Sequence, residues 1–253
     1  MIDKVIEILS LPDKAVIIRK ITKKLFYDNA ELNKREKDAL VSEIESIRLI
    51  AMINEDSFNI GKFRDEDYDY TDIAVIYIDL RKNEKMKTIA KILHEAIPHP
   101  ALLVLGYKNL IVFSTAAKRL NKIDTSKTII EENNFSPWLC IDYPDEKDVD
   151  FINRLKTNTL PFENLYKFYT ELDNRIYLTK AYSIFSKYPK TTKNITKCKS
   201  IIKQIEEVSR EMELIIKQQK QELNFGRKMD MQLKIKEFEK AIEELKNNLN
   251  EVV

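Results

Sequence analysis

The fold of this chain is decided by residues 71–118, which begin with the apolar run IAVIYIDL at positions 73–80. This run is too continuously apolar for a strand with one face in water, and too rich in β-branched residues for a comfortable helix. It therefore predicts a strand that is buried on both faces of a sheet. An amphipathic segment follows at 86–97, and two further apolar runs follow at 101–107 and 110–116.

The succession of strand, helix and strand over this stretch predicts a parallel βαβ unit. In the helix, Met86, Ile89 and Leu93 share one face, which we expect to pack back onto the sheet. Only Lys108 and Asn109 separate the last two apolar runs, and a two-residue gap is typical of a β-hairpin. We therefore expect a mixed sheet with an antiparallel edge.

Elements outside this core follow from the same cues. Asn33 with Glu36 three residues later forms a capping box, which predicts a helix start. The expected elements up to residue 189 are a helix at 1–10, a strand at 15–21, a helix from Asn33 to about Met52, a short strand at 58–60, a polar connection at 118–134, an edge strand at 139–143, and helices at 149–155 and 161–189.

The last sixty residues carry apolar side chains at alternating steps of four and three in two arms, the heptad pattern of a coiled coil. Asn224-Phe225-Gly226 separates the arms, and the glycine suits a left-handed helix stop. The seam residues that we expect to mediate oligomerisation or partner contact are Ile201, Ile205, Val208, Met212, Ile215, Met231, Ile235, Phe238, Ile242, Leu245 and Leu249.

We therefore expect an antiparallel helical hairpin. A second apolar face, with Leu214, Ile216 and Leu233, is not covered by the twin arm in this arrangement. The hairpin should consequently meet another chain, which is either a second copy or a different protein.

The expected fold class is α/β (α+β), with a mixed β-sheet and flanking helices followed by helical elements. We expect three parts: an α/β domain at 1–145, a helical segment packed on it at 146–190, and a helical hairpin or coiled coil at 191–253.

Composition excludes several classes of function. The chain has 3 glycines, far apart, so neither a dinucleotide fingerprint nor a phosphate-binding glycine loop can be built. Cys140 and Cys198 lack metal-site spacing and indicate a reducing compartment. We expect no cofactor, no metal and no catalytic residue. No apolar run is long enough to span a membrane, so we expect a cytoplasmic protein with no membrane partner.

Two histidines are present. We expect His94, on the predicted helix, to be a surface or interface residue. His99 lies between two prolines at a helix-to-strand junction, where an α/β sheet would place a ligand site. A turn residue that caps nearby carbonyls is equally consistent with this position.

A divergent metal-dependent nuclease is one alternative function, because such sites combine carboxylates with a lysine. Here Asp72 opens the central strand, whereas Asp79 ends it and Arg81 stands where a lysine would be wanted. Arginine stays protonated and cannot act as a base. The two aspartates lie at opposite ends and on opposite faces of the strand, so they should not share a metal.

A basic patch near two aromatic residues is the better candidate for nucleic-acid contact, although the net charge of the whole chain is only +2. Lysine and arginine neutralise phosphates, and aromatic side chains stack on unpaired bases. The patch lies beside Phe26 and Tyr27, and its candidate residues are Arg19, Lys20, Lys23, Lys24, Lys118 and Arg119. This patch supports the second alternative, a stand-alone nucleic-acid-binding module.

Several short stretches carry a family resemblance: Leu11-Pro, the segment 19–27, the segment 43–48, Ile97-Pro-His-Pro100 and Asn164-Leu-Tyr166. On these residues the chain resembles the uncharacterised prokaryotic domain-of-unknown-function family four-three-nine-one. The genes of that family often stand beside DNA methyltransferase and helicase genes in phage-defence loci. The resemblance supplies no catalytic residue, and the family pattern has an aromatic residue where His99 stands.

The resemblance implies a non-catalytic accessory or adaptor subunit of an anti-phage, restriction-like defence complex. Its expected partners are a helicase or DNA methyltransferase of the same system. We also expect self-association through the C-terminal hairpin and contact with nucleic acid.

Overall fold

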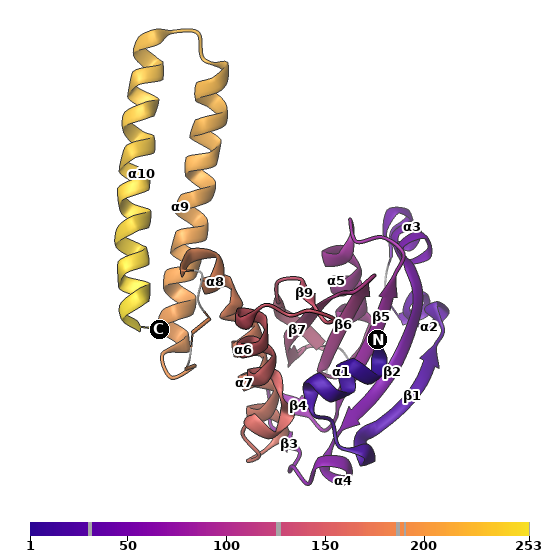
Figure 1. Cartoon of the computed structure of the whole chain (residues 1–253). Helices are drawn as coiled ribbons and strands as arrows, with labels where there is room; N and C mark the ends of the chain where they lie inside the picture. Colours follow the sequence, from indigo (N-terminus) through magenta and orange to yellow (C-terminus); the bar gives the residue numbers. More distant parts are fainter. Residues whose placement is uncertain (30–31, 125–127, 186–187, 190, 253) are drawn as a thin grey trace. The chain divides into compact units, whose positions relative to one another are not determined.

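The structure of the protein is a computed structural model of the whole chain (Figure 1). By its internal contacts the chain divides into two compact units, Met1–Thr179 and Lys180–Val253, which we call the sheet unit and the hairpin unit. The structure describes residues 1–29, 32–124, 128–185, 188–189 and 191–252.

A mixed sheet forms the centre of the sheet unit. Across the described residues its seven strands follow the order β1-β2-β5-β6-β7-β8, and β9 pairs with β7 beside this path. A separate two-stranded ribbon pairs β3 (Phe63–Arg64) with β4 (Asp69–Tyr70). The strands of the large sheet are β1 (Val16–Ile21), β2 (Ile44–Ile53), β5 (Ile73–Leu80), β6 (Ala101–Tyr107), β7 (Leu110–Leu120), β8 (Thr128–Phe135) and β9 (Leu139–Cys140).

The predicted core is confirmed. Strand β5 is buried along almost its whole length, pairs in parallel with β6, and is joined to it by α5 (Met86–Ala96). Strands β6 and β7 form the predicted antiparallel hairpin, and Lys108 in its turn has a φ of 56°. The mixed sheet with an antiparallel edge follows from these two pairings.

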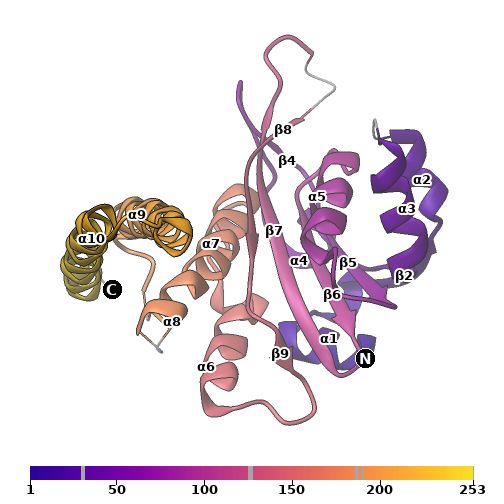
Figure 2. The same cartoon turned by 90° about the horizontal axis from the view of Figure 1, so that it is seen from above.

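Helices cover both faces of the sheet (Figure 2). One face packs against α2 (Lys23–Asn29), α3 (Lys34–Glu43) and α5, with Phe26, Leu40 and Leu93 in a single apolar cluster. The other face carries α7 (Leu165–Tyr177), which contacts β7 and β8. The remaining helical elements of this unit are α1 (Ile2–Leu9), α4 (Glu55–Phe58), α6 (Glu146–Leu155) and two 3-10 turns at Asp13–Ala15 and Thr157–Thr159.

Three sequence predictions for this unit are wrong. The capping box at Asn33 is present, but its helix ends at Glu43, and the β-branched run that follows is strand β2. Helical spacing in this run was misleading, because two register shifts in β2 bring residues of uneven spacing to one face. Residues 58–60 form no strand, and the expected polar connection is largely the end of β7 and strand β8.

The hairpin unit consists of most of α8 (Thr179–Phe185), α9 (Ile195–Gln221) and α10 (Phe225–Val252). Its arms α9 and α10 pair as an antiparallel hairpin (Figure 1). The break between them differs from the prediction. It lies at residues 222–224, where the Asn224 side chain accepts a hydrogen bond from the Arg227 N–H at 3.1 Å. Gly226 lies inside the first turn of α10 and has no left-handed φ.

Candidate protein-interaction surface

The predicted seam joins the two arms of the hairpin. All eleven seam residues are buried or half-buried, and none is exposed. Near the turn the seam becomes polar, since Gln219 Nε2 donates to the Lys228 carbonyl at 3.1 Å and to Gln232 Oε1 at 2.9 Å. The seam therefore holds the arms of one chain together, and its contact with another chain stays a prediction.

The distal half of the hairpin has little interior of its own. Residues 206–234 are all described, and none of them is buried. Two helices of this length, paired along one seam, leave most of their surface in water, and helices in proteins gain most of their stability from packing of an apolar face. A further partner on this half would supply packing that the hairpin itself lacks.

Five large apolar side chains are exposed in this half, and we call them the tip patch: Leu214, Leu223, Phe225, Met229 and Leu233. Leu223 is 96% exposed and Phe225 is 76% exposed. Phe225, Met229 and Leu233 follow one another at steps of four on α10, so they share a face, and the seam residues of α10 lie on the opposite side. The predicted exposure of Leu214 and Leu233 is confirmed, whereas Ile216 is half-buried.

The tip patch differs from ordinary surface residues because its members lie close together in the sequence. Single exposed apolar side chains are normal on a protein surface. Of the 14 exposed large apolar residues in the part of the chain that the structure describes, the five of the tip patch lie within positions 214–233. Each such side chain gains roughly 1.5–3 kcal/mol on full burial. Exposed apolar patches of this kind mark interaction surfaces.

Only some residues of the predicted basic patch lie on the surface of the protein. Arg19, Lys20 and Lys24 are exposed. Lys23 instead donates to the Val41 carbonyl at 3.3 Å and to the Ile44 carbonyl, where it caps the end of α3. Burial and the nearby charge of Arg81 lower the pKa of Lys23. Three of the first four bases therefore remain available to a phosphate.

The other two candidate bases lie elsewhere. Lys118 is 2% exposed, and its ammonium donates to the Ile97 carbonyl and to the His99 carbonyl at 2.9 Å, at the end of α5. This burial removes Lys118 from the surface on which we expected it. Arg119 is half-buried and pairs with Glu131 at 3.5 Å. Alternation along a strand cannot reveal this placement, because β7 is covered on both faces.

Lys118 makes the stability of the sheet unit depend on pH. Burial lowers its pKa to about 7, whereas in the unfolded chain the pKa is about 10.4. Between these values the unfolded state binds more protons, so the free energy of unfolding rises with pH. We expect a gain on the order of 2 kcal/mol between pH 7 and pH 9.

Chemical denaturation at pH 7, 8 and 9 measures this gain, with Lys118→Met as the matched variant. The variant has no ammonium to titrate, so its free energy of unfolding should rise less than that of the natural protein over the same range. Parallel pH profiles for the two proteins would contradict the assignment.

His94 and His99 differ in exposure. His94 is fully buried, which corrects the expectation of a surface or interface residue. Ser114 Oγ donates to Asn133 Oδ1 at 3.0 Å and therefore accepts from His94 Nε2 at 3.2 Å. Burial and the charge of Lys118 hold the pKa of His94 well below its usual range, so it is neutral. His99 is exposed, and its carbonyl accepts from Lys118.

A second buried polar group fastens α7 to the sheet and was not recognised in the sequence. Asp173 Oδ1 accepts from Thr115 Oγ1 at 2.6 Å and from Asn134 Nδ2 at 2.9 Å. The Tyr169 hydroxyl donates to the Ala101 carbonyl at 2.8 Å and accepts from the Ala116 N–H at 2.9 Å. The helical spacing of this stretch does not reveal these bonds, but a polar tip on a buried tyrosine usually finds such partners.

The fold does not bring together Asp72 and Asp79, the two acids that were considered for a nuclease site. Asp72 accepts from Asn54 Nδ2 at 3.1 Å at the start of β5. Asp79 lies near the other end of β5. Burial is the main cause that raises the pKa of its carboxyl, and the charge of Glu45 raises it further. Among the described residues, no group of three or more His, Cys, Asp or Glu is arranged to hold a metal ion. In the same residues, no helix has both the length and the apolar character needed to cross a bilayer.

Comparison with known proteins identifies the family. The profile of the family described as Domain of unknown function (DUF4391) matches residues 9–242, which is nearly the whole chain. Neither the curated proteins nor the solved structures contain a significant match. The match includes all of the short stretches on which the resemblance was based, and it extends over most of the hairpin. The chain therefore belongs to the DUF4391 family.

Proposed function

We propose that the protein is a non-catalytic accessory or adaptor subunit of a prokaryotic anti-phage defence complex. In this role the hairpin unit binds protein partners through the tip patch. The observation that carries the proposal is the group of exposed apolar side chains on the half of the hairpin that has no buried residue. The defence setting, with a helicase or DNA methyltransferase as partner, is what the family resemblance implies.

The arrangement suits an adaptor for a physical reason. A hairpin of two helices of 27 and 28 residues reaches about 40 Å. Apolar side chains at its far end can enter a pocket of a partner, as buried aromatic and aliphatic anchors do in protein interfaces. The seam holds the two arms together and leaves the side chains of the tip patch exposed for binding.

Capture from the native host with mass spectrometry tests the proposal. The bait is the full chain, compared with Leu223→Asp/Phe225→Asp and with the control Leu25→Asp/Val41→Asp. The control residues are 52% and 53% exposed and lie in the sheet unit. We expect the helicase or methyltransferase of the same locus to bind the natural chain and the control, and to be lost from the tip variant. Equal capture by all three baits would overturn the proposal.

A second function, contact with nucleic acid, is favoured by one observation. Arg19 and Lys20 are exposed on the edge strand β1, and Lys24 is exposed on the following helix. Binding through them should weaken steeply as salt rises, because it releases condensed counterions. We expect Arg19→Ala/Lys24→Ala to reduce both the affinity for a DNA duplex and its salt dependence, in fluorescence anisotropy. Binding that is unchanged by this variant would exclude the basic patch.

A further inference from the structure

We infer that strand β1 is a docking site for an extended acidic segment of a partner protein, which joins the sheet as a further strand. This goes beyond the proposed function, because the site lies in the sheet unit and does not depend on the tip patch. Four observations on and beside β1 support it: a free backbone edge, two adjacent exposed isoleucines, a run of bases without an acid, and a small groove.

The outer edge of β1 is unpaired. Among the described residues β1 is the first strand of the sheet order and pairs with β2 alone (Figure 1). Alternate residues of an edge strand point their N–H and C=O groups away from the sheet, where a further strand can pair with them. An added strand as long as β1, which has 6 residues, spans about 20 Å. Backbone pairing of this kind is a recurring way in which sheet edges bind extended peptides.

Two adjacent isoleucines interrupt the regular pairing of β1. The register with β2 shifts between Val16 and Arg19, which forms a bulge at the two residues between them. Ile18 has a φ of 46°, a conformation that β-branched residues rarely adopt and that is found mainly at functional sites. Ile17 and Ile18 are both 49% exposed. Charges and bulges hinder unwanted pairing at an edge, but exposed isoleucines do not serve that purpose.

Bases without any acid surround these isoleucines in the sequence. Residues 14–24 hold five bases and no acid. Four of the five bases are exposed: Lys14, Arg19, Lys20 and Lys24. Glu45 lies near Lys20, but it already pairs with Arg81. Arg19 and Lys20 are consecutive in β1, so two consecutive acids of an added strand would meet one base on each face of the sheet.

The charges of β1 also discriminate between partners. Two β1 edges from different copies would bring Arg19 and Lys20 near the same bases of the other copy, and like charges across strands are destabilising. The bases therefore act against self-pairing at this edge and favour an acidic strand. Nucleic acid would contact the same bases, but it would leave the backbone edge and the isoleucines unused. A peptide uses all three features.

A groove at the start of β1 can hold an apolar side chain of the added strand. It has a volume of about 420 Å³, and Ile17 and Met52 are among the residues that line it. The lining holds one base and one acid, Lys14 and Asp56, so it has no net charge. We therefore expect an apolar residue of the partner in the groove, and its acidic residues further along the strand, beside the two bases of β1.

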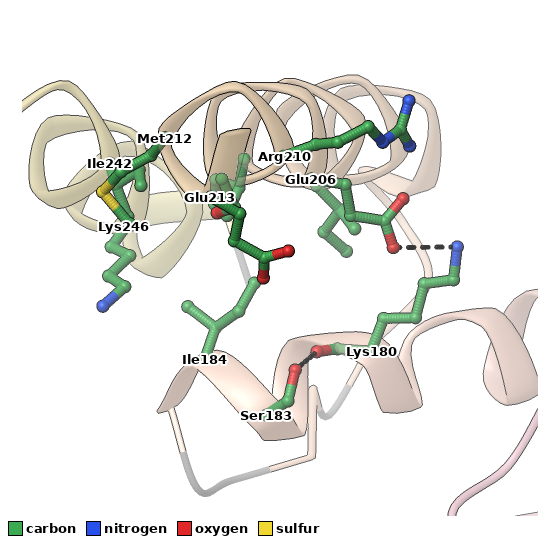
Figure 3. Close-up of a pocket in the computed structure, with 12 residues that line it drawn as sticks. Lys180, Ser183, Ile184, Glu206, Arg210, Met212, Glu213, Ile242 and Lys246 are labelled. Carbon is green, nitrogen blue, oxygen red and sulfur yellow. Dashed lines mark hydrogen bonds and ion pairs between the residues drawn. The ribbon is translucent and has the colours of Figure 1, made fainter. Parts of the chain in front are cut away.

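A larger groove in the hairpin unit lacks this selectivity. It has a volume of about 780 Å³ and lies beside α8, α9 and α10 (Figure 3). Three bases and two acids line it, and Lys180 pairs with Glu206 at 3.2 Å. Three of its isoleucines are buried: Ile202, Ile205 and Ile242. Its mixed charges favour no class of partner, whereas the charges of β1 are all of one sign.

Fluorescence anisotropy with a labelled peptide tests the docking site. The probe is Ile-Val-Glu-Glu-Val-Ile, whose order of apolar and acidic residues is the same in both strand directions. We expect the natural chain to bind the probe at low salt, and Arg19→Glu/Lys20→Glu to weaken binding at least tenfold. Absence of binding to the natural chain at submillimolar protein, or equal binding by this variant, overturns the inference.

A matched control keeps the charge change and moves it to another element. Arg35 and Lys37 are exposed on α3. Arg35→Glu/Lys37→Glu changes the net charge by the same amount as the β1 variant, so it should bind the probe as the natural chain does. An equal loss of binding in the control would show that only the overall charge matters, and it would overturn the site at β1.

Two further measurements separate strand addition from attraction by charge alone. The same peptide with N-methylated backbone nitrogens keeps both acids but cannot donate to the edge, so we expect its binding to be lost. Ile17→Thr/Ile18→Asn should weaken binding of the probe at least fivefold. Thr keeps the β-branch and Asn suits a left-handed φ, so circular dichroism should show an unchanged fold. Equal binding of the methylated peptide, or full binding by this variant, overturns strand addition.

A DNA duplex measured with the same proteins distinguishes a peptide from nucleic acid. Duplex binding should fall in Arg19→Glu/Lys20→Glu and stay unchanged in Ile17→Thr/Ile18→Asn, because phosphates use the charges alone. A natural chain that binds the duplex and not the peptide overturns this inference and supports nucleic-acid contact. The tip patch is intact in all of these variants, so failure of the peptide experiment leaves the adaptor role standing.

Discussion

Replacing Gly106 by alanine should destabilise the sheet unit by about 3 kcal/mol, because overpacking a core with a rigid neighbour costs this much. A methyl group at Gly106 would lie 2.2 Å from the Tyr77 hydroxyl oxygen and 2.8 Å from its ring carbon Cζ. The ring has nowhere to move, since Tyr77 is 3% exposed in the centre of the sheet. Urea denaturation of the two proteins measures the difference.

The loss of stability in Gly106→Ala should come only from the clash with Tyr77. Without a clash, Gly→Ala inside a strand gains about 0.5–1 kcal/mol, because the unfolded chain loses freedom. The double variant Gly106→Ala/Tyr77→Leu should therefore be at least as stable as Tyr77→Leu. Gly61→Ala is the matched control, since its nearest neighbour is the Glu163 carbonyl oxygen at 3.9 Å. Additive effects of the two substitutions would show that the clash is not the cause.

Tyr169→Phe is expected to cost about 3 kcal/mol, because it leaves a buried donor and a buried acceptor unpaired. The β6–β7 pairing ends at Leu103 and Ser114, and two positions further in that register Ala101 would lie opposite Ala116. At this point the Tyr169 hydroxyl bonds to the Ala101 carbonyl and the Ala116 N–H in place of a direct strand-to-strand bond. The hydroxyl therefore continues the ladder from α7.

Hydrogen exchange gives this prediction a local readout. The Ala116 amide should exchange faster in Tyr169→Phe by more than amides elsewhere in β7, and the free energy of unfolding should fall as stated. Tyr143→Phe is the control, because Tyr143 is 85% exposed and its substitution should change stability by less than about 0.5 kcal/mol. A change of that small size in Tyr169→Phe would show that water replaces the hydroxyl.

Sequence patterns identified those helices and strands in which the apolar residues follow a regular local pattern. The continuous apolar run of β5 could only be a strand buried on both faces, and the heptads at the C-terminus could only form a hairpin with one shared seam. The capping box at Asn33 placed the start of α3 because the cap bonds close within four residues. The family resemblance likewise depended only on the order of residues.

Sequence patterns predicted less of the structure where the contacting residues are distant from one another in the sequence. The stretch 44–53 has spacing compatible with a helix, but it is a strand because β5 on one side and β1 on the other satisfy its backbone. Lys118 belongs to a basic cluster in the sequence, yet carbonyls at the end of α5 bind it in the interior. The clash between Gly106 and Tyr77 exists only because β5 and β6 are neighbours.

By itself, then, the sequence determined the buried central strand, the parallel unit built on it, and the helical hairpin, since each is encoded by the period of its own apolar residues. The tertiary structure alone decided which polar groups are enclosed and which apolar groups remain outside. Burial depends on elements that meet from distant parts of the chain. The sequence predicted the exposure of Leu214 and Leu233, whereas the exposure of Leu223, Phe225 and Met229 was found only in the tertiary structure.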